Sequence, residues 1–459
     1  MRLYNTLSRR IEEFVPRGEE VRMYVCGPNL YAPCHLGHAM SYIIFDVLRR
    51  YLEYKGYKVL HVQNFTDIED NIILRARALG RTIHDLAQEH ISLFFRQMDA
   101  LGVQRAHVYP RATEEIPAMI EMIQGLMDRG YAYQAGGDVY FRVLRFADYG
   151  KLSGRRLESL LAGARVEPGE GKEHPADFAL WKGAREGEPS WPSPFGPGRP
   201  GWHIECSAMS LKYLGQPLDI HGGGQDLIFP HHENEIAQSE AYTGEKPFVR
   251  FWMHHGLMRL PESPEKMTRH LGNLVPIDEA LERYGADAIR IFVLSSHYRS
   301  PLTYSEEALR GARAGAERLR LAAYLEEGEG EEEMDPAPYR RRFEEAMDDD
   351  LSTPQALAVL FDLARAINRA RDEGQDTRAG QAALRELAGL LGLRLQEPSP
   401  VRVDATPFIE LLVQVRQELR EQKLYHLADT IRARLAVMGV ALEDTPQGTR
   451  WRWRDEGVG

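Results

Sequence analysis

Cysteine is scarce in this chain of 459 residues, which contains only Cys26, Cys34 and Cys206. Three scattered cysteines do not make a disulfide framework, so metal binding or catalysis in a reducing compartment is the more natural use for them. The sequence also has no run of about 18 apolar residues, and its first residues, MRLYNTLSRRIEEF, lack the apolar core of a secretory signal. These absences predict a cytoplasmic protein without a membrane span.

Positive charge is not in excess either. The formal net charge of −11 argues against indiscriminate binding of nucleic acids, although it leaves room for a local basic groove. Apolar residues make up 43% of the chain, which is enough to form buried cores. The length exceeds that of one ordinary domain, so we expect roughly two to four.

The first 62 residues predict a strand, a helix and a second strand. Residues 21–26 (VRMYVC) are rich in β-branched and aromatic side chains, and Gly27-Pro28 ends this strand. Residues 58–62 form the next strand, and a further helix is expected near Ile68. This order predicts a parallel sheet with a right-handed crossover. Between the strands, apolar residues recur at helical spacing: Met40, Ile43, Ile44, Val47, Leu48, Tyr51 and Leu52.

The motif HLGH, His35 to His38, lies where the first strand gives way to that helix. Parallel sheets bind ligands at the carboxyl ends of their strands and against helix N-termini. Gly37 would let a ligand approach the backbone, and the two imidazoles could hydrogen-bond charge that develops on a phosphate. In the simpler alternative, one histidine caps the helix and the other is polar surface. Cys34 is expected to be a small buried residue.

Residues 221–235, HGGGQDLIFPHHENE, are a second candidate site. Three glycines follow the apolar run 218–220 and are expected to form a turn where a ligand meets bare backbone. Pro230 is expected to open a helix that places His231 and Glu235 on one face, where both could bind zinc. The simpler alternative is a loop followed by an exposed polar helix.

Residues 116–200 interrupt the alternation of strands and helices, with a hairpin expected at Gly136-Gly137-Asp138, and are interpreted as an inserted domain. Cys206 is expected to begin the helix that follows, where a thiol has a lowered pKa. Cys206 and Cys26 are 180 positions apart, so spacing alone does not join them into one site.

The second half of the chain is predicted to be mainly helical. Residues 251–260 look like another sheet strand, and 264–273 form a loop suited to clamping a phosphate, or simply an exposed basic loop. Residues 325–338 are an acidic linker, and 339–395 are helical with a break at 347–354. Near the C-terminus, alternating arginine and tryptophan offer phosphate contacts and stacking faces for unpaired bases, or describe an ordinary edge strand. The residues concerned are Arg450, Trp451 and Trp453.

These motifs resemble those of the class I aminoacyl-tRNA synthetases, and most closely the cysteinyl-tRNA synthetase family. HLGH resembles the class I HIGH motif, and Lys266 to His270 occupies the place of KMSKS. Other matching stretches are MYVCGP (23–28), PGWHIECS (200–207), DIHGGG (219–224), FPHHENE (229–235), HYRS (297–300), MDDD (347–350) and EDTPQGT (443–449). The resemblance therefore covers essentially the whole chain.

The resemblance implies one zinc ion. Its ligands would be Cys26, Cys206, His231 and Glu235. The zinc would bind the substrate cysteine's sulfur as thiolate, because zinc lowers the pKa of a thiol enough to deprotonate it. Serine offers only a neutral hydroxyl, a much poorer partner, so no editing domain would be needed.

The resemblance also implies the remaining site residues. His35 and His38 would stabilise the α-phosphate of ATP, with Lys266 and Arg269 at the phosphates and Mg²⁺ accompanying the nucleotide. Asp226 would pair with the substrate ammonium. The other implied contacts to cysteine or ATP are Gly37, Thr66, Trp202, His221, Gly222, Gly223, Gly224, Met267 and Thr268.

The implied fold is a Rossmann-type α/β catalytic domain with an inserted connective domain, followed by a helical bundle and a small C-terminal domain. The expected limits are 1–115 and 201–260 for the catalytic halves, 116–200 for the insertion, 261–324 for the KMSKS-like loop and stem-contact helices, and 339–395 and 400–459 for the anticodon-binding parts. Expected partners are tRNA(Cys), L-cysteine and ATP, and the protein is expected to be a monomer.

One motif departs from the family pattern, because KMSKS reads KMTRH here. Lys266 is retained, Arg269 replaces the second lysine, and His270 replaces a serine. Arginine keeps the charge but presents a planar fork, so we expect phosphate binding with altered loop geometry. The alternatives are a cysteine:amino-sugar ligase of the mycothiol pathway type, which would lack the C-terminal part, and a non-catalytic paralogue that binds zinc and tRNA.

Overall fold

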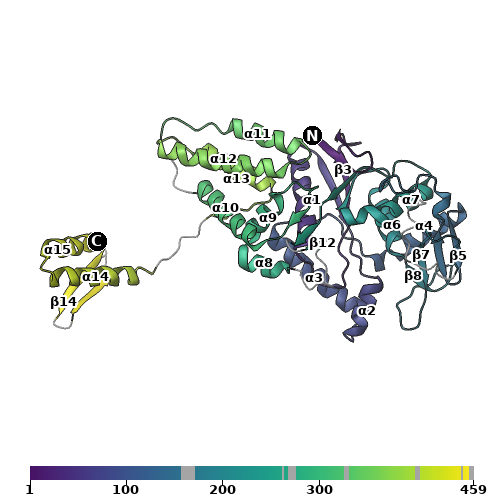
Figure 1. Ribbon diagram of the computed structural model, residues 1–459, viewed down its shortest axis with the longest axis horizontal. Coiled ribbons are helices and arrows are strands. Elements are labelled where there is room, and N and C mark those ends of the chain that lie inside the picture. The colour runs from purple at the N-terminus through teal and green to yellow at the C-terminus, as the bar shows by residue number, and fades with distance from the viewer. Residues whose placement is uncertain are drawn as a thin grey trace, which may run out of the picture. The chain divides into compact units, whose positions relative to one another are not determined.

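The protein is described by a computed structural model (Figure 1). It covers residues 1–156, 171–260, 263–266, 275–324, 330–397, 404–445 and 448–453, with the backbone alone for 263–266. Chain contacts divide it into a first unit, Met1–Glu397, and a second unit, Pro398–Gly459. The finer domain limits expected from the sequence stay predictions. None of the described helices combines the length and the apolar character needed to cross a membrane.

A four-stranded parallel sheet forms the centre of the first unit. Its strands are β3 (Glu20–Val25), β4 (Lys58–Gln63), β9 (Leu218–Gly224) and β10 (Val249–His255), in the order β10-β9-β3-β4. Helix α1 (Leu36–Tyr54) joins β3 to β4, and α7 (Glu233–Thr243) lies between β9 and β10. The connections leave β3 and β9 in opposite directions, which opens a ligand crevice at the carboxyl ends of these two strands. The predicted parallel sheet is confirmed.

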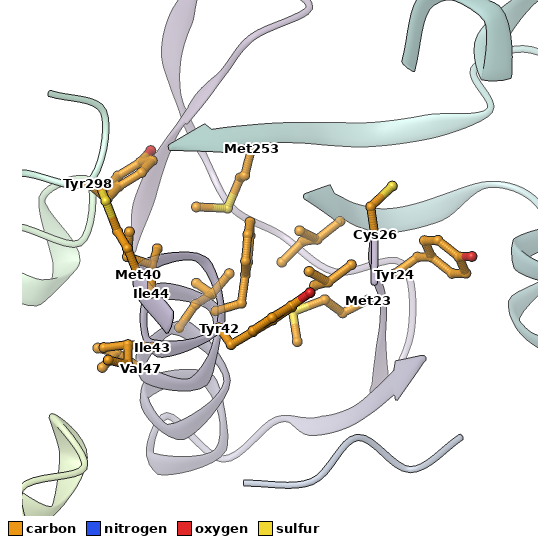
Figure 2. Packing of buried hydrophobic residues seen from close by; sticks show 14 of the residues in the cluster. Met23, Tyr24, Cys26, Met40, Tyr42, Ile43, Ile44, Val47, Met253 and Tyr298 are labelled. Carbon is orange, nitrogen blue, oxygen red and sulfur yellow. The ribbon is translucent and has the colours of Figure 1, made fainter. Parts of the chain in front are cut away.

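Helix α1 packs against this sheet through the apolar residues that the 3.6-residue period identified, all of which are buried. Figure 2 shows Met40, Ile43, Ile44 and Val47 on the helix, with Met23 of β3 and Met253 of β10 reaching toward it. A Cβ at position 222 would lie 2.2 Å from the Phe45 ring of α1, so only glycine allows this approach. The predicted glycine turn was therefore wrong: Gly222, Gly223 and Gly224 complete strand β9, and Gly222 lets the helix come close.

The insertion contains α4 (Ile116–Asp128) and an antiparallel sheet of β5 (Ala132–Ala135), β6 (Asp138–Phe141), β7 (Phe178–Gly183) and β8 (Gly198–Pro200). The predicted hairpin joins β5 to β6, with Gly136 at φ 61°. In Figure 1 these elements lie at the opposite end of the first unit from α11, α12 and α13. Helix α6 (Trp202–Leu214) returns the chain to the central sheet. Cys206 is its fifth residue, so the prediction that this cysteine begins the helix was wrong.

The predicted strand 251–260 is in fact two strands. β10 ends at His255, and β11 (Met258–Leu260) pairs with β12 (Ser263–Lys266) and β13 (Leu302–Thr303) in a separate sheet. The break falls at Gly256, where a Cβ would lie 2.2 Å from the Ser300 carbonyl oxygen. The chain therefore leaves the central sheet where the 297–301 turn crosses it.

Helices make up most of the rest of the first unit. They are α2 (Asp70–Ala78), α3 (Ile83–Leu101), α8 (Ile277–Tyr284), α9 (Ala286–Leu294), α10 (Glu306–Tyr324), α11 (Ala337–Asp348), α12 (Thr353–Asp372) and α13 (Arg378–Leu390). The predicted helical region is confirmed, with its break where Asp350 and Leu351 have φ of 55° and 53°. A short N-terminal hairpin, β1 (Arg2–Asn5) and β2 (Arg10–Glu13), completes the unit.

The second unit contains α14 (Thr406–Glu421), α15 (Tyr425–Val437) and the antiparallel pair β14 (Val440–Thr445) and β15 (Gly448–Trp453). Its buried core consists of Ile409, Leu435, Val440 and Leu442. The predicted edge strand is confirmed. Trp451 packs on that core, and the centroid of the Trp453 ring lies 5.9 Å from that of the Trp451 ring in an edge-on arrangement. Trp453 is 56% exposed.

Candidate active site

A cavity of about 520 Å³ lies at the carboxyl ends of β3, β4 and β9. It brings together most of the residues that the sequence assigned to substrate, nucleotide and metal. Those that line it are Cys26, His35, Gly37, His38, Thr66, Trp202, Cys206, Gly223, Gly224, Asp226 and His231. Lys266 ends β12, whereas Met267, Thr268, Arg269 and His270 lie outside the described residues.

The four expected zinc ligands converge at one edge of this cavity. Cys26 follows β3, and its sulfur lies 3.9 Å from the sulfur of Cys206 on α6. The same Cys26 sulfur is 3.8 Å from Oε1 of Glu235, and His231 Nε2 is 3.0 Å from that oxygen. All four side chains are buried. The packing of α6 against β3 therefore brings together the two cysteines that sequence spacing could not connect.

His231 and Glu235 meet in a different way from the one predicted. Pro230 lies inside a π-helical turn, η4 (Ile228–His232), which is kinked at Phe229, and α7 begins only at Glu233. The prediction that Pro230 opens the helix was therefore wrong. The turn runs directly into α7, so the four-residue spacing still places both side chains on one side.

His221 and Gly222 are not at the cavity surface, although the sequence placed both among the substrate contacts. His221 is fully buried behind Glu235, and its Nε2 lies 2.8 Å from Oε2 of that carboxylate. Its ring stacks on Trp252 of β10 at 4.5 Å. His221 therefore orients Glu235, whose other oxygen faces His231.

A fifth side chain that reaches this cluster, His232, was not singled out by the sequence. Its Nε2 lies 3.3 Å from the Cys26 sulfur, and Cys26, His231, His232 and Glu235 offer ligand atoms within 4.8 Å of one another. The Nδ1 atom of His232 is 2.7 Å from His254 Nε2. The doublet His231-His232 was visible in the sequence, and the three-residue spacing from His232 to Glu235 was the signal that could have identified it.

The charges of the cluster depend on one another. Burial raises the pKa of the Cys26 thiol, whereas its hydrogen bond to Cys206 lowers the pKa of Cys206 to about 6. The expected lowering at Cys206 therefore has a neighbouring thiol, not a helix end, as its cause. Burial raises the pKa of Glu235, but His221 and His231 outweigh it and bring it to about 2. Burial lowers the pKa of His232 well below the usual range.

The two HLGH histidines form the N-terminal cap of α1. The His35 Nδ1 accepts from Gly37 N at 3.1 Å, and the His38 Nδ1 accepts from His35 N at 3.2 Å. Each neutral ring then carries its hydrogen on Nε2. Both histidines also line the cavity. Capping the helix and facing a ligand are therefore compatible, because the Nδ1 atoms cap the helix and the Nε2 atoms remain for a ligand. Two N–H donors at a helix N-terminus suit a phosphate.

Asn64 is a further residue that the sequence analysis left unassigned. Its Oδ1 accepts from Gly27 N at 2.9 Å and lies 3.8 Å from the Cys206 sulfur. Its Nδ2 donates to Thr66 Oγ1, which in turn donates to Glu205. A Cβ on Gly27 would lie 1.5 Å from the Asn64 carbonyl oxygen, so the chain after Cys26 needs glycine there. Asn64 thus holds both thiol-bearing segments and the predicted substrate contact Thr66.

Two family models match the chain. One, described as the tRNA synthetases class I (C) catalytic domain, matches residues 13–314, and a DALR domain model matches residues 342–396. A relative from Dehalococcoides mccartyi (strain 195) named cysteine–tRNA ligase is 58% identical, over 98% of this chain and 99% of its own length. Relatives of the same name from Carboxydothermus hydrogenoformans and Thermococcus onnurineus are each 50% identical over 98% of this chain and 100% and 99% of their own.

Solved structures share the fold at low sequence identity. Mycobacterium tuberculosis methionyl-tRNA synthetase in complex with methionyl-adenylate has a TM-score of 0.59 at 17% identity, over 82% of this chain and 90% of that one. An Agrobacterium radiobacter LeuRS, in a ternary complex with tRNA and LeuAMS, has a TM-score of 0.58 at 14% identity, over 84% and 88%. At these identities the likeness extends to the fold alone.

Proposed function

Because the chain belongs to the cysteine–tRNA ligase family of class I aminoacyl-tRNA synthetases, we propose that it activates L-cysteine with ATP and transfers the cysteine to tRNA(Cys). The observation that carries this proposal is the shared cavity, whose lining includes the HLGH histidines and both thiols of the metal-binding cluster. A site that binds sulfur is thus next to a site that binds phosphate. The relatives match along almost their whole length, and nothing supports the amino-sugar ligase or the non-catalytic paralogue.

We assign one zinc ion to Cys26, Cys206, His231 and Glu235. Two sulfurs bound at 2.3 Å in a tetrahedral site lie about 3.8 Å apart, and those of Cys26 and Cys206 are 3.9 Å apart. A set of two thiols, an imidazole and a carboxylate, all buried, suits zinc better than the hard cations, which prefer oxygen. When bound, the ion supplies a Lewis acid that keeps the substrate thiol in its thiolate form.

The side chains of this protein do the remaining work of activation. Asp226 lines the cavity and pairs with the substrate ammonium, which aims the substrate carboxylate at the α-phosphorus of ATP. The Nε2 hydrogens of His35 and His38 donate to the α-phosphate oxygens as their charge grows. Attack forms cysteinyl-adenylate and releases pyrophosphate, whose negative charge Lys266 and Arg269 stabilise; Mg²⁺, when bound with ATP, would neutralise part of the same charge. The 3′-terminal ribose hydroxyl of the tRNA then attacks the adenylate carbonyl and releases AMP.

The C-terminal parts supply tRNA recognition in this proposal. Residues 339–395, most of which match the DALR domain model, and residues 400–459 contact the anticodon arm. Arg450 offers a phosphate contact, and Trp451 and Trp453 offer stacking faces. The enzyme acts as a monomer in the cytoplasm, where it meets tRNA and ATP.

The test is pyrophosphate exchange and tRNA charging by the purified protein, with cysteine and serine compared. Cysteine is expected to support both reactions, and serine to be slower in exchange by roughly 10⁴-fold or more, because it leaves the metal unsatisfied. Exchange with serine within about 100-fold of that with cysteine would contradict sulfur recognition by the metal. Charging of an amino-sugar acceptor but not of tRNA would overturn the proposal itself.

A further inference from the structure

A second cleft, of about 810 Å³, lies between the N-terminal hairpin and the last described residues of the insertion before position 157. The hairpin contributes Leu7 and Arg9, and residues 147–156 contribute the remainder of the described lining. Four cations, Arg9, Lys151, Arg155 and Arg156, line it together with a single acid, Asp148. In a chain of net charge −11 this is a local excess of positive charge.

The acid does not neutralise the arginines. Asp148 forms an ion pair with Lys246 at 2.5 Å, and Lys151 is paired with buried Glu240 at 2.5 Å. Among the residues that the structure describes, no carboxylate lies within ion-pair distance of Arg9 or Arg155, and both arginines are exposed. Their positive charge is therefore available to an anion.

Two of the arginines, Arg9 and Arg155, are held in place by their neighbours at the cleft. Arg9 is the last residue of the turn between β1 and β2 and has φ 59°, in the left-handed region. From this turn its guanidinium packs onto Gly154, where a Cβ would lie 1.8 Å from Nη2. Arg155 lies over the ring of Phe229 at 4.4 Å. The hairpin turn and the ring of Phe229 thus hold two guanidinium groups at the surface of the cleft.

The loop that carries Arg155 is supported by α7, the helix that also carries Glu235 of the metal-binding cluster. Glu233 accepts from Gly150 N at 2.9 Å and Ser153 N at 2.8 Å, and Asn234 accepts from the Tyr149 hydroxyl at 2.5 Å. Glu233 and Asn234 lie between His231 and Glu235 in the sequence. Within HHENE, His231 and Glu235 thus belong to the proposed metal site, whereas Glu233 and Asn234 fix the loop that presents Arg155.

We propose that this cleft binds phosphates of the tRNA sugar-phosphate backbone. The inference rests on the proposed function, which requires the enzyme to hold a polyanion next to the aminoacylation site. Exposed arginine forks are suited to phosphate oxygens, and they position the nucleic acid without reading its sequence.

The test measures tRNA affinity of the full-length enzyme by fluorescence anisotropy between 50 and 200 mM salt. Arg9→Ala and Arg155→Ala are each expected to raise the Kd roughly 3- to 10-fold and to reduce the slope of log Kd against log salt by about 1. Cysteine-dependent pyrophosphate exchange needs no tRNA and is expected to stay unchanged. Arg10→Ala removes the same charge from the same hairpin outside the cleft, and is expected to leave the Kd within 2-fold.

Arg9→Gly separates binding from structural support. Glycine relieves the positive φ, so the melting temperature is expected to rise or stay constant while tRNA affinity falls as in Arg9→Ala, and Arg9→Lys is expected to restore part of it. An unchanged Kd and salt slope in both alanine variants would overturn the inference, as would an equal loss in Arg10→Ala. Neither result would affect the proposed function, which fails only if the unaltered enzyme shows no cysteine-dependent exchange.

Discussion

His232 illustrates how a neutral histidine can act on a metal site without binding the metal. Its Nδ1 lies 2.7 Å from His254 Nε2, and His254 Nδ1 lies 2.8 Å from the Thr6 hydroxyl. If Thr6 donates to His254 and His254 donates to His232, then His232 carries its remaining hydrogen on Nε2, which points at the Cys26 sulfur. An N–H donor at a thiolate stabilises its negative charge. We therefore place His232 behind the metal ligands.

Two variants distinguish ligand from supporting residue. Cys206→Ser is expected to lose stoichiometric zinc, because it replaces a thiolate ligand with a neutral hydroxyl. His232→Gln keeps a donor near Cys26, so it is expected to retain one zinc per chain with an affinity about 10- to 100-fold lower, as for other residues that support metal ligands. Elemental analysis and competition with a chelator measure both. If His232→Gln lost all zinc and Cys206→Ser retained it, His232 would be the ligand and Cys206 the supporting residue.

Arg269 carries the departure from KMSKS, and its role is argued from the sequence. If its guanidinium takes the place of the second lysine at the phosphates, Arg269→Ala is expected to slow cysteine-dependent pyrophosphate exchange by about 10²-fold. Arg269→Lys restores the usual residue and serves as the matched control, with exchange expected near that of the unaltered enzyme. An Arg269→Ala variant with an unchanged exchange rate would contradict the assignment.

At the scale of elements, helix α1 is held by a buried ion pair two turns beyond HLGH. Asp46 accepts from Arg290 of α9 at 2.5 Å, and neither side chain is exposed. Arg290 also donates to the carbonyl oxygens of Leu391 and Leu101, so one guanidinium joins α1, α9 and the ends of α13 and α3. The helix whose N-terminus carries the HLGH histidines is thus fixed to the helical region that contains α13.

Breaking this pair on one side is expected to be costly. Asp46→Asn leaves the Arg290 charge buried without its counter-ion, so the free energy of unfolding of the first unit is expected to fall by about 3–5 kcal/mol. Asp46→Leu combined with Arg290→Met removes both charges and is expected to cost much less. Urea unfolding followed by far-UV circular dichroism measures both variants. Equal destabilisation in the single and the double variant would show that packing, not charge, decides.

An ion pair of the second unit predicts its response to acid. Arg416 is buried and binds both carboxylate oxygens of Asp444 at 2.7 and 2.8 Å, which holds the pKa of Asp444 well below its usual range. A lowered folded pKa stabilises the unit above the unfolded value of about 3.9, and this contribution is lost as the pH falls below it. Thermal melts of the second unit are expected to shift downward below pH 4, and Asp444→Asn is expected to remove that shift.

The sequence predicted elements whose causes are local and missed those whose causes are tertiary. The helical period of α1 and the order of strand, helix and strand depend on consecutive residues, so both predictions were correct. Gly222 was assigned to a turn because glycine is typical of turns, whereas Phe45 of a distant helix is the reason for it. His232 and Asn64 act through partners on other strands. Cys26 and Cys206 come together only in the folded structure. Before the structure, only the family resemblance indicated that they belong to one metal site.

At the scale of the whole molecule, the catalytic cavity lies within one unit, whereas the proposed tRNA contacts come from both. All described residues of the catalytic cavity belong to the first unit, Met1–Glu397. The second unit has its own core of four buried apolar residues and its own ion pair. Each unit is therefore stabilised by its own buried core. The proposed tRNA contacts of Arg450, Trp451 and Trp453 all come from the second unit.

This division predicts that activation survives without the second unit. A chain ending at Glu397 is expected to keep cysteine-dependent pyrophosphate exchange within about 2-fold, because the whole cavity remains, while kcat/KM for charging tRNA(Cys) falls by about 100-fold or more, equivalent to about 2.7 kcal/mol of lost binding. A full-length chain with Trp453→Ala and Arg450→Ala tests the proposed contacts without truncation, and a smaller loss in the same parameter is expected. Loss of exchange in the shortened chain would show that the second unit supports the catalytic site, and undiminished charging would remove tRNA recognition from it.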